Sequence, residues 1–462
     1  MTDRSQRFDR SIVEGPLPAA VWKLAWPTML QNMIGGLQGL VDHTLVGHFV
    51  GYTANAAIGV SWQIFLLVIV FISSLYTGMA VLVARHAGAG DAASVNRVVY
   101  QALLTSIGLS LAVLAPAGYF LSPYLLDLVN AAPEVKAEAL PFLRVMFVFS
   151  LGLLVFFLLG GAFRAVGDAR TPLRLGIALT VLNAGLNVVF IRGLGPVPSF
   201  GTMGAAMGTV IANALVGAFG FWLLFGGRSV IRLSTRMSWR PDRTIIRSLL
   251  RFGLPTGFQG VAMNIAGVLL LRYIGSLQHS AAAQAAYAVG YTELFSFITW
   301  SSVGLMGATA TVAGQNLGAN RPERSAQGAF VAARFGLALA ATVGLVFLAV
   351  PRQLYAVFGL TEPLVVGLGV DLLKYLSVSG LFITVALAYT GGLQGSGDTK
   401  SPFYISVISQ IVVPLGTCAA ISAMRPLDPH DIWRAIVVGH ITRCTLSVLR
   451  FRQGKWRDIQ VS

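Results

Sequence analysis

Apolar runs of about 20 residues recur along the whole chain and are separated by short polar segments. A run of that length crosses the ~30 Å hydrocarbon core of a bilayer as an α-helix. The runs do not alternate with the period of two that marks a membrane β-barrel, so each predicts a spanning helix. The predicted spans are 19–49, 55–86, 96–120, 138–162, 172–192, 202–226, 246–276, 281–313, 326–350, 368–393, 401–424 and 431–451.

A polar turn between two of these runs occurs twice. Phe163–Leu173 and Leu393–Phe403 share the order apolar, polar, small, small, Gly-Asp, small, base, hydroxyl, Pro, apolar, and they start at a spacing of 393 − 163 = 230. That spacing is far longer than the roughly 20–50 residues of a solenoid repeat. It therefore indicates a duplicated helical bundle.

Two further pairs of segments extend the duplication. Ala25–Gln31 resembles Gly253–Gln259 at a spacing of 253 − 25 = 228, and Gly88–Gly90 resembles Gly318–Asn320 at 318 − 88 = 230. Six spans separate the copies, an even number, so both halves have the same orientation and form a parallel repeat. We expect an all-α integral membrane protein with two lobes around a cleft that opens to either side. The expected parts are a cytoplasmic tail 1–18, an N-lobe 19–226, a basic cytoplasmic linker 227–245, a C-lobe 246–451 and a cytoplasmic tail 452–462.

Composition and charge agree with a membrane protein. The chain is 55% hydrophobic and 11% charged, whereas soluble domains carry roughly 25% charged residues. Its net charge of +15 is concentrated in alternate loops, above all in residues 228–251, where seven arginines accompany the single acid Asp242. This is the positive-inside pattern, which predicts that both termini are cytoplasmic. It accounts for the basic charge without a nucleic-acid partner.

Asp42 is the most distinctive polar residue, because it lies in the middle of the first span. A charge inside a span is costly and marks a functional candidate. The cost of its buried anion favours proton uptake, which suits a group that binds and releases H⁺. The alternative is a packing acid that pairs with a neighbouring polar group.

Two other spans carry polar candidates. Asn183 and Asn187 are four residues apart in the fifth span and hence on one helix face. They either bond a protonated Asp42 and line the cavity, or bond a neighbouring helix. Glu293, in the eighth span, either takes up a cation or proton or neutralises Arg272 of the seventh span.

In their order and spacing, these motifs resemble the multidrug and toxic compound extrusion (MATE) family, and more closely its DinF-like bacterial branch. The resemblance covers Ala20 to Phe451. Besides the repeated turn, it is carried by Trp26-Pro27, Gly39-Leu40-Val41-Asp42, Val46-Gly47-His48, Ala54 to Gly59, Asn183 to Asn187, Gly201 to Ala206 and Val312 to Ala319.

The resemblance implies twelve spans in two six-helix lobes that export amphipathic, often cationic drugs and metabolites in exchange for H⁺ or Na⁺. NorM-like members carry a Glu and an Asp for cation binding where this sequence has Met263 and Ile383, which favours proton coupling through Asp42. Some relatives also carry an acid at the position of Asn187. The expected cation-coupling residues are Asp42, Asn183, Asn187 and Glu293, and the expected substrate-binding residues are Asp42, Gln38, Asn183 and Met33.

The resulting hypothesis is a proton-driven efflux antiporter of the bacterial inner membrane that works as a monomer among membrane lipids. It needs no cofactor beyond the coupling ion, H⁺ or less favourably Na⁺. One alternative is a flippase for lipid-linked precursors or polysaccharides of the same superfamily. That function calls for several arginines in the cavity, whereas Arg272 is the main mid-span base. The other is a membrane enzyme, and the sequence offers no cluster of catalytic groups for one.

Overall fold

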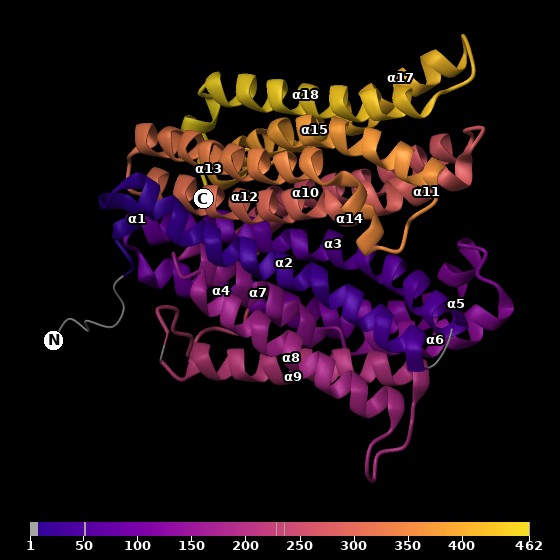
Figure 1. Ribbon diagram of the computed structural model, residues 1–462. Helices are drawn as coiled ribbons and strands as arrows, with labels where there is room; N and C mark the ends of the chain where they lie inside the picture. The colour runs from indigo at the N-terminus through magenta and orange to yellow at the C-terminus, as the bar shows by residue number, and fades with distance from the viewer. Residues whose placement is uncertain (1–7, 50–51, 228, 235, 462) are drawn as a thin grey trace. The chain divides into compact units, whose positions relative to one another are not determined.

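The computed structural model of the chain describes residues 8–49, 52–227, 229–234 and 236–461, and it describes the side chains in these ranges except those of residues 37–53 and 55. Within these residues every regular element is a helix (Figure 1). The chain forms two compact units. The first unit contains residues 8–10 and Leu30–Leu254, and the second contains Ser11–Met29 and Pro255–Val461.

Two long helices, α2 (Leu17–Phe49) and α10 (Arg243–Gly275), each contribute to both units, because the units divide after Met29 and after Leu254. The other helices of the first unit are α3 (Tyr52–Ala89), α4 (Ala92–Leu109), η2 (Ser110–Leu114), α5 (Ala115–Leu128), α6 (Pro133–Val148), α7 (Leu151–Ala165), α8 (Arg170–Arg192) and α9 (Gly201–Phe225). Those of the second unit are α1 (Ser11–Glu14), α11 (Ser280–Tyr287), η3 (Ala288–Leu294), α12 (Ser296–Gly318), α13 (Pro322–Ala349), α14 (Pro351–Val357), α15 (Pro363–Ser396), α16 (Lys400–Val407), η4 (Ile408–Val412), α17 (Val413–Ser422), α18 (Pro429–Arg452) and η5 (Lys455–Asp458).

Every span predicted from the sequence falls on helical segments to within two residues at its ends, with 138–162 divided between α6 and α7, and the all-α fold is confirmed. Among the described residues, ten helices are long and apolar enough to cross a membrane, and α6 with α7, bent by 53° between them, adds an eleventh. α2 covers the remaining predicted span, 19–49. The sequence pattern did not foresee the π-helical turns η2, η3 and η4, each of which continues a longer helix.

The helices α3 and α12 end in the same way, at the repeated segments Gly88–Gly90 and Gly318–Asn320. The chain leaves α3 at Gly90 (φ 79°) and α12 at Asn320 (φ 57°), in the left-handed region that favours these two residue types. In both turns the next residue, Asp91 or Arg321, donates its N–H to the carbonyl five residues earlier. This is the Schellman motif, and its repetition gives a local structural counterpart to the duplicated sequence.

The turn that is repeated most clearly in the sequence is repeated in structure as well. The N–H of Asp168 bonds to the Phe163 carbonyl after α7, and that of Asp398 bonds to the Leu393 carbonyl after α15, both at 2.9 Å. Each aspartate then accepts from the helix that follows. Asp168 takes the backbone N–H of Thr171 at 3.0 Å, and Asp398 takes that of Ser401 at 3.1 Å. The repeated order of small residue, Gly-Asp and hydroxyl thus encodes a helix end followed at once by a helix start.

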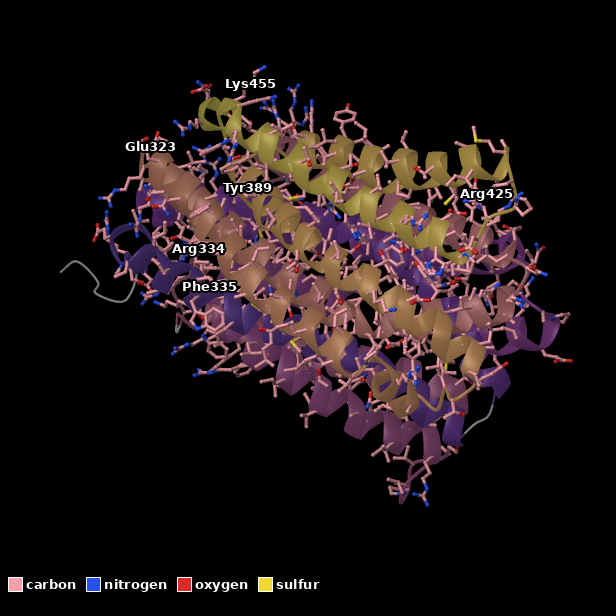
Figure 2. All side chains as sticks on the ribbon, turned by 45° about the horizontal axis from the view of Figure 1, so that its top comes forward. Glu323, Arg334, Phe335, Tyr389, Arg425 and Lys455 are labelled. Atoms are coloured by element: carbon pink, nitrogen blue, oxygen red, sulfur yellow. The ribbon has the colours of Figure 1, made fainter. Side chains whose placement is uncertain are left out.

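α15 is the central helix of the second unit and packs against α12, α13 and α18 (Figure 1). Glycines allow the close approach on one side: a Cβ on Gly391 would meet the backbone of Met306, and one on Gly395 would meet that of Ala310, both on α12. Figure 2 labels Arg425 and Lys455, which lie just outside the two ends of α18.

Candidate functional site

Two of the residues expected at the site, Gln38 and Asp42, belong to α2, but their side chains lie outside the described residues. Met33 lies on the same helix, a little more than one turn before Gln38, and is half-buried. The proposed roles of these three residues therefore stay predictions.

Asn183 and Asn187 are brought together on α8 and are both fully buried. The Nδ2 of Asn187 donates to the Oδ1 of Asn183 at 3.3 Å, and the Nδ2 of Asn183 donates to the Oγ1 of Thr209 on α9 at 2.9 Å. Gly208 of α9 lies directly against Asn187. Of the two interpretations offered by the sequence, this geometry is that of a bond between neighbouring helices.

Glu293 lies in the π-helical turn η3 and is half-buried. Arg272, its expected partner, is exposed on α10. Among the residues described here, no hydrogen bond or ion pair engages the Glu293 carboxylate.

A polar contact recurs at equivalent positions of the two units. In the first, Arg164 Nη1 donates to Gln31 Oε1 at 3.1 Å. In the second, Gln394 Nε2 donates to Gln259 Oε1 at 3.3 Å. The partners are related by the same spacings as the sequence repeat, 259 − 31 = 228 and 394 − 164 = 230. The repeat thus keeps a contact between its first and fourth spans, although arginine stands at one position and glutamine at the other.

Arg164 itself lies in the last turn of α7, and not in the loop where the sequence interpretation put it. Its guanidinium runs back along the helix, so that a Cβ on Gly160 would stand 3.2 Å from Nη1. The side chain is half-buried. Arg164 is therefore a cation held against the bundle of the first unit.

The sequence interpretation missed two basic residues in the middle of α18. His440 is 2% exposed and Arg443 is 6% exposed. Both lie inside the predicted span 431–451, so a search for bases within the spans would have found them, just as it found Arg272. Their packing inside the bundle needed the structure.

Aromatic rings from η3 and its flanking residues lie next to His440 and Arg443. Tyr287, Tyr291 and Phe295 lie one above another, with ring centroids 4.9 Å and 5.4 Å apart. Phe295 stacks on the His440 ring at 5.7 Å, and Tyr287 stacks on Trp433 at 6.1 Å. The second unit thus contains an aromatic wall, Tyr287–Tyr291–Phe295, that faces a buried stripe of α18.

An apolar pocket of roughly 590 Å³ lies elsewhere in the second unit, between the start of α2 and α13. Trp22 and Phe335 close part of it, with ring centroids 5.4 Å apart, and Figure 2 labels Phe335 on α13. Met29 and Leu305 also line it. Such a surface suits a hydrophobic chain or ring.

A family model described as MatE matches residues 27–189 and again residues 255–418 of this chain. The two matches begin at a spacing of 255 − 27 = 228, which is one of the spacings of the internal repeat. The expectation of two homologous halves is therefore supported independently of the motifs.

Curated relatives match over nearly their full length. The "Probable multidrug resistance protein NorM" of Thermotoga maritima is 27% identical over 442 residues, which cover 94% of this chain and 92% of that protein. The "Multidrug resistance protein PmpM" of Pseudomonas aeruginosa is 26% identical over 452 residues, which cover 95% of this chain and 91% of that protein.

Solved structures share the fold. An outward-facing multidrug resistance MATE family transporter of the MOP superfamily superposes with a TM-score of 0.90 at 21% identity, over 99% of this chain and 100% of that one. A MOP superfamily transporter from Pyrococcus furiosus, described as having a binding pocket of reverse polarity, superposes with a TM-score of 0.86 at 21% identity, over 97% and 98% of the two chains.

Proposed function

This chain belongs to the MatE family of membrane transporters, and on that premise we propose that it exports amphipathic, often cationic compounds across the bacterial inner membrane in exchange for H⁺. The observation that carries the proposal is the family match in both halves, joined to relatives that are named multidrug resistance proteins and match over nearly their full length.

The repeated architecture supports transport by alternating access. Each half is a compact helical unit, and the two carry the same turns and the same polar contact at equivalent positions. Duplicated bundles of this kind can move as nearly rigid bodies about a substrate site. Cytoplasmic termini and action as a monomer belong to the same proposal.

Proton coupling is proposed for Asp42, the acid in the first span. In the ionised state Asp42 attracts a cationic substrate from the inner side. Protonation from the outer side removes that attraction and releases the substrate outward. Met263 and Ile383 offer no carboxylate for sodium, and Ile383 is buried in apolar packing at 3% exposure. Glu293 is the remaining carboxylate that suits a cation in the second unit.

The test is ethidium efflux from proteoliposomes, driven by a pH gradient in one series and by a sodium gradient in another. Wild type is compared with Asp42→Asn and with Asp371→Asn. Asp371 is a suitable control because its carboxylate already forms an exposed ion pair with Lys374, at 2.8 Å.

We expect efflux driven by the pH gradient alone, lost in Asp42→Asn and kept in Asp371→Asn. Efflux that is driven by sodium and unaffected at Asp42 would refute proton coupling and direct attention to Glu293. If neither gradient drives efflux while the protein is folded, the drug-export proposal is wrong.

A second candidate is a flippase for lipid-linked, phosphate-bearing precursors. It is favoured by Arg164, a basic side chain that is held against the helical bundle of the first unit and that the sequence interpretation did not count among the mid-span bases. A fluorescent polyprenyl diphosphate, reconstituted in vesicles and probed from outside with dithionite, distinguishes the two. Flipping that requires Arg164 supports this second candidate, and ethidium efflux without flipping supports the first.

A further inference from the structure

Arg443 is a buried cation without a counter-charge in the part of the chain that the structure describes. Its side chain lies in the middle of α18, where the residue is only 6% exposed. Its Nε is buried and has no hydrogen-bond partner, and no carboxylate of the described residues forms an ion pair with it. An isolated ion inside a protein costs several kcal/mol unless something compensates its charge.

The nearby acids on the same helix and on the facing wall are otherwise engaged or not in contact. Asp431 is held by both terminal nitrogens of Arg425, at 2.7 Å and 2.8 Å. It also stands 443 − 431 = 12 positions earlier, or about 18 Å along the helix. Glu293 makes no ion pair with Arg443. The positive charge is therefore not neutralised from within the described part of the second unit.

Other polar atoms on the same face of α18 also lack partners. The Nδ1 of His440, the Oγ of Ser447 and the Nε1 of Trp433 are buried and unbonded among the described residues. Positions 433, 440, 443 and 447 fall on one helix face, because successive members differ by 7, 3 and 4. Buried polar groups are nearly always satisfied, so the unbonded atoms of this stripe call for partners from outside the described residues.

The site is centred between His440 and Arg443. These two are separated by about 4.5 Å along the helix axis, whereas Trp433 is about 15 Å from Arg443 along the same axis. Tyr291 belongs to the aromatic wall beside them, since its ring lies against Phe295, which in turn stacks on the His440 ring. A guanidinium, an imidazole and a phenol supply hydrogen-bond donors in a surrounding of rings and aliphatic side chains.

We propose that the second unit holds a compact, singly charged anionic group at Arg443, with His440 and Tyr291 as its further donors. The group is either a free halide ion or the carboxylate of a bound organic acid. A larger dianion is disfavoured, because one guanidinium would leave half of its charge uncompensated in the bundle. The site lies within the second unit and does not depend on which compounds the protein exports.

The proposal is tested by thermal denaturation of the purified full-length protein in detergent. Sodium chloride and sodium benzoate are titrated separately into wild type, Arg443→Gln, Arg443→Lys and Arg272→Gln. Arg272→Gln is the matched control, because it makes the same chemical change at an exposed arginine of the same unit. Its response contains the general effect of salt on exposed charges.

We expect a saturable rise in Tm of about 5 °C in wild type and Arg272→Gln. The rise is lost in Arg443→Gln and requires a higher anion concentration in Arg443→Lys. Saturation with chloride identifies a free ion, and saturation with benzoate alone identifies an organic carboxylate. A wild type that does not respond saturably to either anion overturns the proposal and leaves water to solvate the site.

The Arg443→Lys variant keeps the proposal testable even when the Arg443→Gln variant does not fold. If Arg443→Gln does not fold, an unchanged concentration dependence in Arg443→Lys overturns the proposal, and a shift to higher concentration supports it. An equal saturable rise in a folded Arg443→Gln would also overturn it.

Discussion

Arg164 donates a hydrogen bond of 3.1 Å from its Nη1 to the Oε1 of Gln31, and so ties the end of α7 to α2 within the first unit. At the equivalent place in the second unit, two glutamines make the bond, and Ser406 adds a third member by accepting from Gln259 at 2.7 Å. The residue equivalent to Ser406 is Gly176, whose missing side chain leaves room for Gln31. The same contact is thus built from two different sets of residues.

Arg164→Gln should therefore keep the contact by copying the second unit. We expect its free energy of unfolding to fall by less than about 1 kcal/mol. Arg164→Leu leaves the Gln31 carbonyl oxygen without this donor and should cost about 1–2 kcal/mol. Unfolding of both variants in detergent measures the difference. Equal losses would show that the charge of Arg164, and not its hydrogen bond, stabilises the turn.

The two repeated aspartates should differ in their contribution to stability. Asp398 accepts from Ser401 and also from Arg450, whose Nε and Nη2 lie 3.0 Å and 2.8 Å from its Oδ2. Asp168 bonds its own helix start, and no basic side chain pairs with it among the described residues. Asp398→Asn should cost about 2–3 kcal/mol, and Asp168→Asn about 1 kcal/mol. Thermal unfolding of the two variants compares them directly, and an equal cost would assign no stabilising role to Arg450.

Gly208 should not tolerate a side chain. A Cβ there would collide with the Asn187 side chain and stand 3.0 Å from its backbone nitrogen. Gly208→Ala should separate α8 from α9 and cost about 1–3 kcal/mol. Gly185→Ala is the control, since a Cβ at Gly185 meets nothing within 4 Å. It should be neutral or stabilise α8 by about 0.5–1 kcal/mol. Similar unfolding temperatures for the two variants would contradict this close packing.

Asp242 should make part of the stability dependent on pH. Burial alone would raise its pKa, but hydrogen bonds from the backbone of Ile245 and Thr244, and the Arg97 guanidinium, hold the pKa below its usual value. A depressed pKa means that the stabilisation is complete above the unfolded value of about 3.9 and is lost as pH falls through the folded pKa.

The measurement for Asp242 is the difference in Tm between wild type and Asp242→Asn as a function of pH. We expect a constant difference from pH about 8 down to about 5 and a decline towards zero below about 4. Asp458→Asn, at an exposed aspartate of the tail, should show no such difference. A difference for Asp242→Asn that grows on acidification would be incompatible with the depressed pKa.

The hydropathy pattern was sufficient to predict the helices, and the duplicated turn motif was sufficient to predict their repeat. Length and apolar content determine where a chain can cross a bilayer, and each predicted span lies on helix. The turns were predictable too, because Gly-Asp before a hydroxyl residue and proline specifies a helix end and a new start. Asp168 and Asp398 have that local role.

Lateral contacts could not be predicted in the same way. Spans that are apolar on all sides carry little information about which face meets which neighbour. Asn183 and Asn187 therefore had two open interpretations, and Arg443 was overlooked. Its importance depends on which groups of the neighbouring helices lie beside it. The role of Asp42 is still a prediction from the sequence.

The π-helical turn η3 shows how the two halves have diverged since their duplication. The helix that contains η3 runs from Ser280 to Gly318 and has 39 residues, whereas its counterpart α3, Tyr52–Ala89, has 38. The later copy is therefore longer by one residue. In a regular α-helix each added residue would rotate everything beyond it by about 100°. A π turn absorbs extra residues locally, so the ancestral helix end survived a change of length in its own middle.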